Sequence, residues 1–307
     1  MDQVRTKHQG PSTKDYVACC LILLAGPLFL GQTQREPSLP DLLQRAGAYV
    51  QQVERDFSTV ISNEEYEQKF VWRSGNARAG SSRKLTSEMS FMWMPNEMLW
   101  ITIRNVLRLD GAPVADSRQR IEAAIDDQNA GRVSQLRRLR DEGARFNIGR
   151  ISRNFSDPML GLQVVEPGFQ PRFTFSVAGA ERIRGVDTVH VTFVEHGSPT
   201  LIRRGTDFQD LPTHGDVWIH AGDGVIHQTR LVTVDNKFDT RSTITVQFAH
   251  DSKLERWLPQ RMDEEYVRQG VETRVRGAFA EAFTERIECV ATYANYRRFE
   301  TSGRVLQ

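Results

Sequence analysis

Cysteine is scarce in this chain, and its placement leaves none to pair. Three cysteines occur among 307 residues, and two of them, Cys19 and Cys20, lie in an apolar run near the N-terminus. If that segment is removed, only Cys289 remains and no intrachain disulfide can form. Cys289 falls in the alternating stretch "IECVATY", which is typical of a small buried hydrophobe. Stability must therefore come from a packed core and not from disulfides.

An excess of charge of one sign is also missing. The formal net charge is +1, and charged residues make up 26% of the chain. Nucleic-acid-binding domains usually carry a basic footprint, so this balance gives no reason to expect a nucleic-acid partner. With 39% hydrophobic residues the composition is that of a globular protein.

Short catalytic motifs are absent from the sequence as well. It contains no G-x-S-x-G elbow, no H-E-x-x-H pair, no Walker loop and no G-x-G-x-x-G turn. We therefore expect a non-enzymatic protein without a cofactor.

The sequence has one long hydrophobic run. Arg5, Lys7 and Lys14 precede the apolar stretch 16–31, which is shorter than the roughly 20 residues of a membrane span. This pattern predicts a signal peptide over 1–33, a tether over 34–40 and a periplasmic location. An uncleaved membrane anchor of the same orientation is the alternative.

The rest of the chain has the pattern of one helix and then many strands. Apolar residues at 42, 43, 46, 49, 50, 53 and 57 have helical spacing. Period-two stretches begin after residue 62 and return from about 171, separated by Gly, Asp and Pro turns, with an Arg-rich helical insert at about 116–150. The sequence predicts one α+β domain over 41–307: a long curved antiparallel sheet, an incomplete barrel, with helices packed on one face.

The stretch "GDVWIHAGDGVIHQT", 215–229, is a candidate metal site. A hairpin turn at Gly222-Asp223 would put His220 opposite Val225 and Trp218 opposite His227, with all four side chains on one face. His214 is the third histidine that a metal-dependent hydrolase would need. The other interpretation is that these histidines are ordinary hairpin residues.

The stretch "MSFMWMPNEMLW", 89–100, is a candidate ligand site. Four of the seven methionines lie here with three aromatic residues, and apolar side chains fall on both faces of the strand. Either the sheet is covered on both sides, or one side lines a cavity for an acyl chain or apolar peptide. The predicted lining is Met89, Phe91, Trp93, Met98, Trp100 and Trp218.

The Arg-rich insert is the third candidate. Its arginines, among them Arg137 and Arg138, alternate with acidic residues. A solvated face of mixed charge accounts for this pattern. The alternatives are contact with an anionic membrane surface, or with an envelope protein partner in a scaffold or stress-sensor module.

Several short motifs resemble a known superfamily. The hairpin "DVWIHAGDGVIHQT", the stretch "ERWLPQRMDEEY" and the closing "ATYANYRRF" resemble the bacterial outer-membrane lipoprotein carriers (LolA/LolB-like), a superfamily that includes periplasmic regulators of envelope stress. The stretches 100–121 and 171–195 look closer still to secreted bacterial proteins of unknown function. The resemblance implies an incomplete antiparallel barrel whose apolar cavity binds acyl chains. It supplies no catalytic residues, and His220 stands where the hairpin often has Asp.

Overall fold

The structure, a computed structural model, describes most of the chain after its N-terminal segment. The described residues are 37–56, 59–116, 118–127, 131–151, 153, 155–205, 207–273 and 280–298. Residues 36–307 form one compact unit. The predicted signal peptide, or anchor, lies outside the described residues. Among those described, no helix is both long and apolar enough to cross a membrane.

Helix α1 (Leu39–Asp56) includes the last two residues, 39 and 40, of the predicted tether. Ser38 accepts a hydrogen bond from the Asp41 amide and so caps the helix. In the apolar stripe of the helix, Leu42, Ala46, Val50 and Val53 are buried, and each of the larger aliphatic side chains among them contributes about 1.5–3 kcal/mol. Leucine and valine at helical spacing therefore hold α1 against the sheet.

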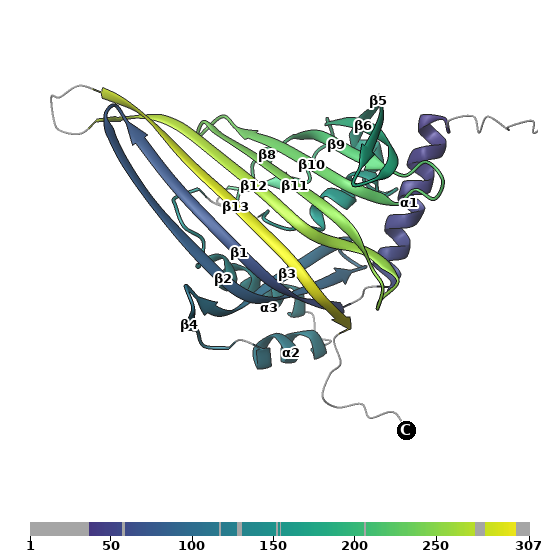
Figure 1. Cartoon of the computed structure of the whole chain (residues 1–307), viewed down its shortest axis with the longest axis horizontal. Coiled ribbons are helices and arrows are strands. Elements are labelled where there is room, and N and C mark those ends of the chain that lie inside the picture. Colours follow the sequence, from purple (N-terminus) through teal and green to yellow (C-terminus); the bar gives the residue numbers. More distant parts are fainter. Residues whose placement is uncertain are drawn as a thin grey trace, which may run out of the picture. The chain divides into compact units, whose positions relative to one another are not determined.

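An open antiparallel sheet of 11 strands forms the body of the unit (Figure 1), in the order β4-β3-β2-β1-β13-β12-β11-β10-β9-β6-β5. This confirms the predicted α+β class. The strands are β1 (Thr59–Ser74), β2 (Ala77–Met94), β3 (Leu99–Leu109), β4 (Ala112–Pro113), β5 (Phe173–Ile183), β6 (Val186–Glu195), β9 (Thr213–Ile219), β10 (Ile226–Asp235), β11 (Thr240–Asp251), β12 (Arg256–Thr273) and β13 (Ala280–Arg298). A small second sheet pairs β7 (Ile202–Arg203) with β8 (Asp210–Leu211).

The main core lies on one face of this sheet, which we call the inner face. Period-two alternation directs residues such as Met89, Phe193, Ile244 and Tyr266 to this face. Helix α1 and the 3₁₀ segment η1 (Leu160–Val165) pack on it, and a second 3₁₀ segment, η2 (Gln170–Arg172), leads into β5. Gly161 of η1 is required because a Cβ there would lie 2.4 Å from Thr229 Oγ1 of β10.

A smaller core lies on the other face, the outer face, at β2 and β3. The insert expected at about 116–150 contains α2 (Arg118–Asp126) and α3 (Arg132–Ala144). Their apolar side chains pack on Met92, Met94, Ile101 and Ile103, which alternate with the inner-face residues of the same strands. Helices were expected on one face of the sheet, and the structure has helices on both faces. Packing on both sides explains why the stretch 89–100 is apolar on both faces.

Candidate ligand-binding site

Four of the six predicted lining residues lie together on the inner face of β2 and β3. Met89, Phe91 and Trp100 are buried, and Trp93 is partly buried beside them. The ring centroids of Trp93 and Trp100 are 5.4 Å apart. In this structure these side chains form part of the main core. Their role in holding a ligand stays a prediction.

The other two predicted lining residues lie apart from these four. Met98 is in the β2–β3 turn with φ of 48° and is 41% exposed. Trp218 stacks on His190 at 4.7 Å and donates from Nε1 to Glu181 at 2.7 Å. Its neighbours in β9, Val217 and Ile219, belong to the main core, so Trp218 faces outward. Trp218 therefore lies on the opposite face of the sheet from Met89, and its role in a lining stays a prediction.

The β9–β10 hairpin brings two of the three candidate histidines together. The His220 amide donates to the Val225 carbonyl at 2.8 Å, as predicted, and the His220 and His227 ring centroids are 6.3 Å apart. Trp218, however, pairs with Gln228, because β10 has an irregularity between Ile226 and Gln228. The predicted pairing of Trp218 with His227 was wrong by one residue, which a bulge accounts for.

The third histidine is far from the other two. His214 pairs with Val232 and precedes His220 by six residues, a span of roughly 20 Å at the usual rise of a strand. His220 contacts Asp223 through Nδ1 at 2.7 Å, and burial lowers the pKa of His227. In the part of the chain that the structure describes, no three His, Cys, Asp or Glu side chains are placed to hold a metal. In this structure His214 is therefore too far from the other two histidines to share a metal ion with them.

A cavity of about 240 Å³ lies on the inner face, beyond the main core. Its wall combines apolar side chains with arginines and hydroxyl groups. The lining residues are Arg150, Ile151, Phe155, Arg204, Gly205, Leu211, Thr233, Asp235, Phe238, Thr240, Ser242 and Arg268.

Strands β10, β11 and β12 form the floor of this cavity. Thr233 pairs with Ser242 across β10 and β11, and Thr240 pairs with Arg268 across β11 and β12. These residues continue the inner-face alternation of Leu231, Ile244 and Tyr266, all of which are in the main core. The same face therefore changes from apolar core to polar floor along each strand.

Residues 148–151, 153 and 155, called the segment 148–155 below for its described residues, form the opposite wall, and Gly149 lets them lie close on the sheet. Gly149 has φ of 81°, and a Cβ there would lie 2.5 Å from Ile287 Cδ1. The Arg150 amide donates to Glu285 Oε1 at 3.0 Å. Phe155 lies near the Tyr266 ring, with centroids 6.2 Å apart. These contacts bring Ile151 and Phe155 over the floor.

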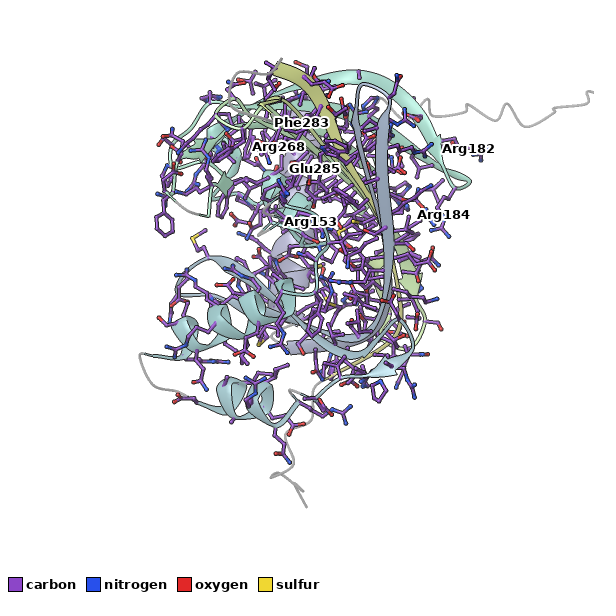
Figure 2. All side chains as sticks on the ribbon, turned by 90° about the vertical axis from the view of Figure 1, so that its left-hand side faces the viewer. Arg153, Arg182, Arg184, Arg268, Phe283 and Glu285 are labelled. Carbon is purple, nitrogen blue, oxygen red and sulfur yellow. The ribbon has the colours of Figure 1, made fainter. Side chains whose placement is uncertain are left out.

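Arg153 anchors this segment in the buried part of the inner face. Its Nη1 donates to Tyr66 Oη at 3.0 Å and to Cys289 Sγ at 2.9 Å, and its Nη2 donates to Gln68 Oε1 at 2.6 Å. Figure 2 shows Arg153, Glu285 and Arg268 along the inner side of the curved sheet, with Arg182 on the opposite flank.

Two buried carboxylates lie under the segment. Glu264 accepts hydrogen bonds from the hydroxyls of Tyr66 and Tyr266, each at 2.6 Å. Burial, and next the nearby Glu264 charge, raise the pKa of both tyrosines well above the usual range, so both stay protonated and donate. Glu64 is paired with Arg104 through two hydrogen bonds of 2.6 and 2.9 Å. Each buried negative charge thus has donors.

Cys289 is an unreactive thiol in this position. It is buried, and burial raises the pKa of its thiol to about 12. A thiolate is the reactive form of cysteine, so this residue is not a nucleophile at neutral pH. The prediction of a small buried side chain in a strand fits its position in β13.

At the mouth of the cavity, the guanidinium of Arg204 is neutralised. Arg204 makes two hydrogen bonds to Asp235, of 2.7 and 2.6 Å, and two more to Asp207. Lys237 also contacts Asp207, at 3.0 Å. Phe238, which is exposed, completes this rim.

A wider depression of about 740 Å³ lies along β1 and β2. Charged surface residues such as Glu67, Lys69 and Lys84 line much of it, and Lys84 is paired with Glu67 at 3.4 Å. The smaller cavity, with aromatic walls and arginines, is the better candidate for a ligand site.

None of the cavity residues was among the predicted site residues. Arg150 and Arg268 are 118 positions apart, and neither belongs to a local motif. The one available signal was that Arg268 continues the inner-face alternation of Met262, Glu264 and Tyr266. A charged residue at that position of a strand faces the interior.

Comparison with known proteins gives remote structural matches. No family model matches the chain, and neither does any curated protein sequence. Among solved structures, a putative outer membrane lipoprotein-sorting protein domain from Vibrio parahaemolyticus is 9% identical with a TM-score of 0.30, covering 86% of this chain and 94% of that one. A DUF1329 family protein from Desulfovibrio piger is 10% identical with a TM-score of 0.29, covering 85% and 94%.

The Pseudomonas aeruginosa MucA/MucB complex contains a further match. It is 10% identical with a TM-score of 0.21, covering 85% of this chain and 98% of that one.

Proposed function

We propose that this protein is an exported, non-enzymatic binding protein for an apolar ligand, such as a lipid, an acylated peptide or the acyl chain of a lipoprotein. The observation that carries this proposal is the cavity between the segment 148–155 and strands β10 to β12. The proposed location is the periplasm, because the N-terminal pattern is that of a signal peptide.

The shape and lining of the cavity support a ligand of this kind. Binding pockets are usually concave and mostly apolar, with a few polar groups that orient the ligand. Ile151, Phe155, Leu211 and Phe238 supply the apolar wall. The volume of about 240 Å³ is near the lower end of the range for small-molecule sites. It suits one end of an amphiphile better than a whole lipid.

The first experiment is mass spectrometry of the full chain purified from the periplasm. The intact protein is measured under native conditions, and the same sample is then extracted with organic solvent. We expect a co-purifying lipid or acylated molecule. A protein with nothing bound would contradict the proposal, and would favour a partner-binding scaffold that uses Arg137 and Arg138, both exposed on α3.

Two variants and a control locate the ligand. Phe155→Asn, in the cavity wall, should reduce ligand retention, whereas Phe208→Asn, at an exposed ring outside the lining, should not. Met98→Lys tests the lining predicted from sequence. Loss of ligand in Met98→Lys together with retention in Phe155→Asn would place the ligand outside this cavity.

A further inference from the structure

We propose that the ligand carries an anionic group and that Arg268 and Arg150, which both line the cavity, bind it. This inference rests on the proposed function, because it names the chemical class of the ligand in the same cavity. The shared chemistry is a negatively charged oxygen group, either a carboxylate or a phosphate, attached to an apolar chain.

The charge of the cavity lining points to an anion. Three arginines and one aspartate line the cavity. The aspartate, Asp235, is fully engaged with Arg204 through two hydrogen bonds, and Asp207 binds the same arginine. The other two arginines, Arg150 and Arg268, face the cavity without an acidic residue of the lining left to pair with them.

Arg268 is held in place by a long ion pair with Glu285. Its Nη1 is 3.9 Å from Glu285 Oε2, which is too long for a hydrogen bond. Among the described residues, its Nε is buried without a hydrogen-bond partner. Leaving a buried donor unpaired costs free energy, and a small shift of the guanidinium that let an anion accept from it would recover that cost. The guanidinium lies 5.6 Å from the Phe283 ring, which orients it.

Glu285 positions both arginines but does not take the place of an anionic ligand on their side chains. Its side chain is 3% exposed, and its Oε1 accepts the hydrogen bond from the Arg150 amide at 3.0 Å. This carboxylate therefore fixes the backbone at Arg150. The exposed Arg150 side chain, which lines the cavity, stays available at its opening.

The remaining lining matches the other parts of an amphiphile. Hydroxyl groups of Thr233, Thr240 and Ser242 lie on the floor, and the apolar wall of Ile151 and Phe155 lies opposite. An anionic headgroup at Arg268 would direct an attached chain along this wall. A guanidinium can hold a carboxylate or phosphate through two hydrogen bonds, which fixes orientation as well as affinity.

The test is isothermal titration of the purified, delipidated full chain with three probes that share a twelve-carbon chain. These are dodecanoate, dodecyl phosphate and dodecanol, the two anions kept below their micelle concentrations and dodecanol below its solubility limit. We expect at least one anionic probe to bind roughly tenfold or more tightly than dodecanol, the size of a charge-assisted hydrogen bond. The ratio of the two anions identifies carboxylate or phosphate. Added salt should weaken the anions and leave dodecanol unchanged.

Variants of Arg268 show whether this residue is responsible. Arg268→Met should remove most of the preference for the anion and leave dodecanol binding within about twofold, while Arg268→Lys should restore part of it because the charge is kept. Arg286→Met is the matched control, since Arg286 is in the same strand pair on the outer face and contacts Glu265 and Glu288.

The outcomes separate this inference from the proposed function. Equal binding of all three probes, with no effect of Arg268→Met, would overturn the anionic inference and leave the apolar cavity in place. Absence of binding by any probe would overturn both. Thermal unfolding of each variant in parallel confirms that changes in binding do not come from loss of the fold.

Discussion

At the scale of single residues, the inner face is unusual because it buries charge. Glu64 is completely inaccessible, and Arg104 lies over the Tyr66 ring at 4.2 Å while it pairs with this carboxylate. Taking both charges out of water is costly, and the pair compensates only while both partners are present. Each residue is therefore far more important to the fold than a surface charge would be.

Replacing Arg104 should show this directly. We expect Arg104→Met to lower the free energy of unfolding by about 3–5 kcal/mol, because Glu64 is then left as an uncompensated buried charge. The double variant Glu64→Gln with Arg104→Met should recover part of the loss. Urea unfolding followed by tryptophan fluorescence measures both values.

A surface pair provides the comparison for this experiment. Arg182 and Asp187 are 3.2 Å apart with side chains that are mostly exposed. Arg182→Met should cost no more than about 1 kcal/mol. If Arg104→Met cost no more than Arg182→Met, the buried pair would not have the structural role assigned to it.

At the scale of elements, the segment 148–155 depends on one glycine. Gly149 combines a left-handed backbone with close contact to Ile287. We expect Gly149→Ala to lower the free energy of unfolding by about 2–4 kcal/mol, from the left-handed conformation and from the crowded Cβ. It should also weaken ligand binding, because the segment forms a wall of the cavity.

Gly111 separates these two causes. It has a similar φ, 85°, but a Cβ there would meet nothing within 4 Å. Gly111→Ala should therefore cost only the conformational part, about 1–2 kcal/mol, with no effect on binding. Equal losses in the two alanine variants would mean that contact with the sheet at Gly149 is unimportant.

Elements of this kind differ in how far the sequence can predict them. The strands were visible because Tyr66, Gln68, Met262 and Tyr266 alternate with polar residues, and α1 because Leu42, Ala46 and Val50 have helical spacing. Both patterns come from one buried face. Alternation also predicted which residues of β2 lie on each face. It could not predict which helices cover those faces, because that depends on contacts distant in sequence.

The site could not be predicted in the same way. A single irregularity in β10 moved Trp218 from its predicted partner His227 to Gln228. The cavity depends on β10–β12 register and on where the segment 148–155 crosses the sheet, neither of which leaves a local pattern. Methionine-rich composition at 89–100 indicated apolar burial correctly, but composition does not distinguish core from cavity.

At the scale of the whole compact unit, one end of the inner face is closed and the other is not. Helix α1 closes its end through hydrogen bonds such as Arg45 Nη1 to the Ala221 carbonyl at 2.6 Å, and through the ion pair of Arg256 with Asp56. The cavity lies beyond the main core, where the floor is polar. Closure by α1 therefore governs stability, while the proposed ligand site lies away from it.

The closure by α1 should depend on pH through one residue. Burial, and next the nearby charge of Glu166, raise the pKa of Glu54 to about 8, and its Oε1 has no hydrogen-bond partner within the described part of the chain. Because this pKa is above the unfolded value of 4.5, the folded state holds the proton more tightly. The resulting stability is complete below pH 4.5 and is lost as the pH rises through 8.

Glu54→Gln cannot ionise, so its melting temperature should exceed that of the unmodified protein at pH 9, and the difference should shrink or reverse at pH 5. Glu97→Gln, at an exposed glutamate, should show no such pH-dependent gain. If the melting temperatures of Glu54→Gln and the unmodified protein differed by the same amount at every pH from 5 to 9, Glu54 would not control this closure.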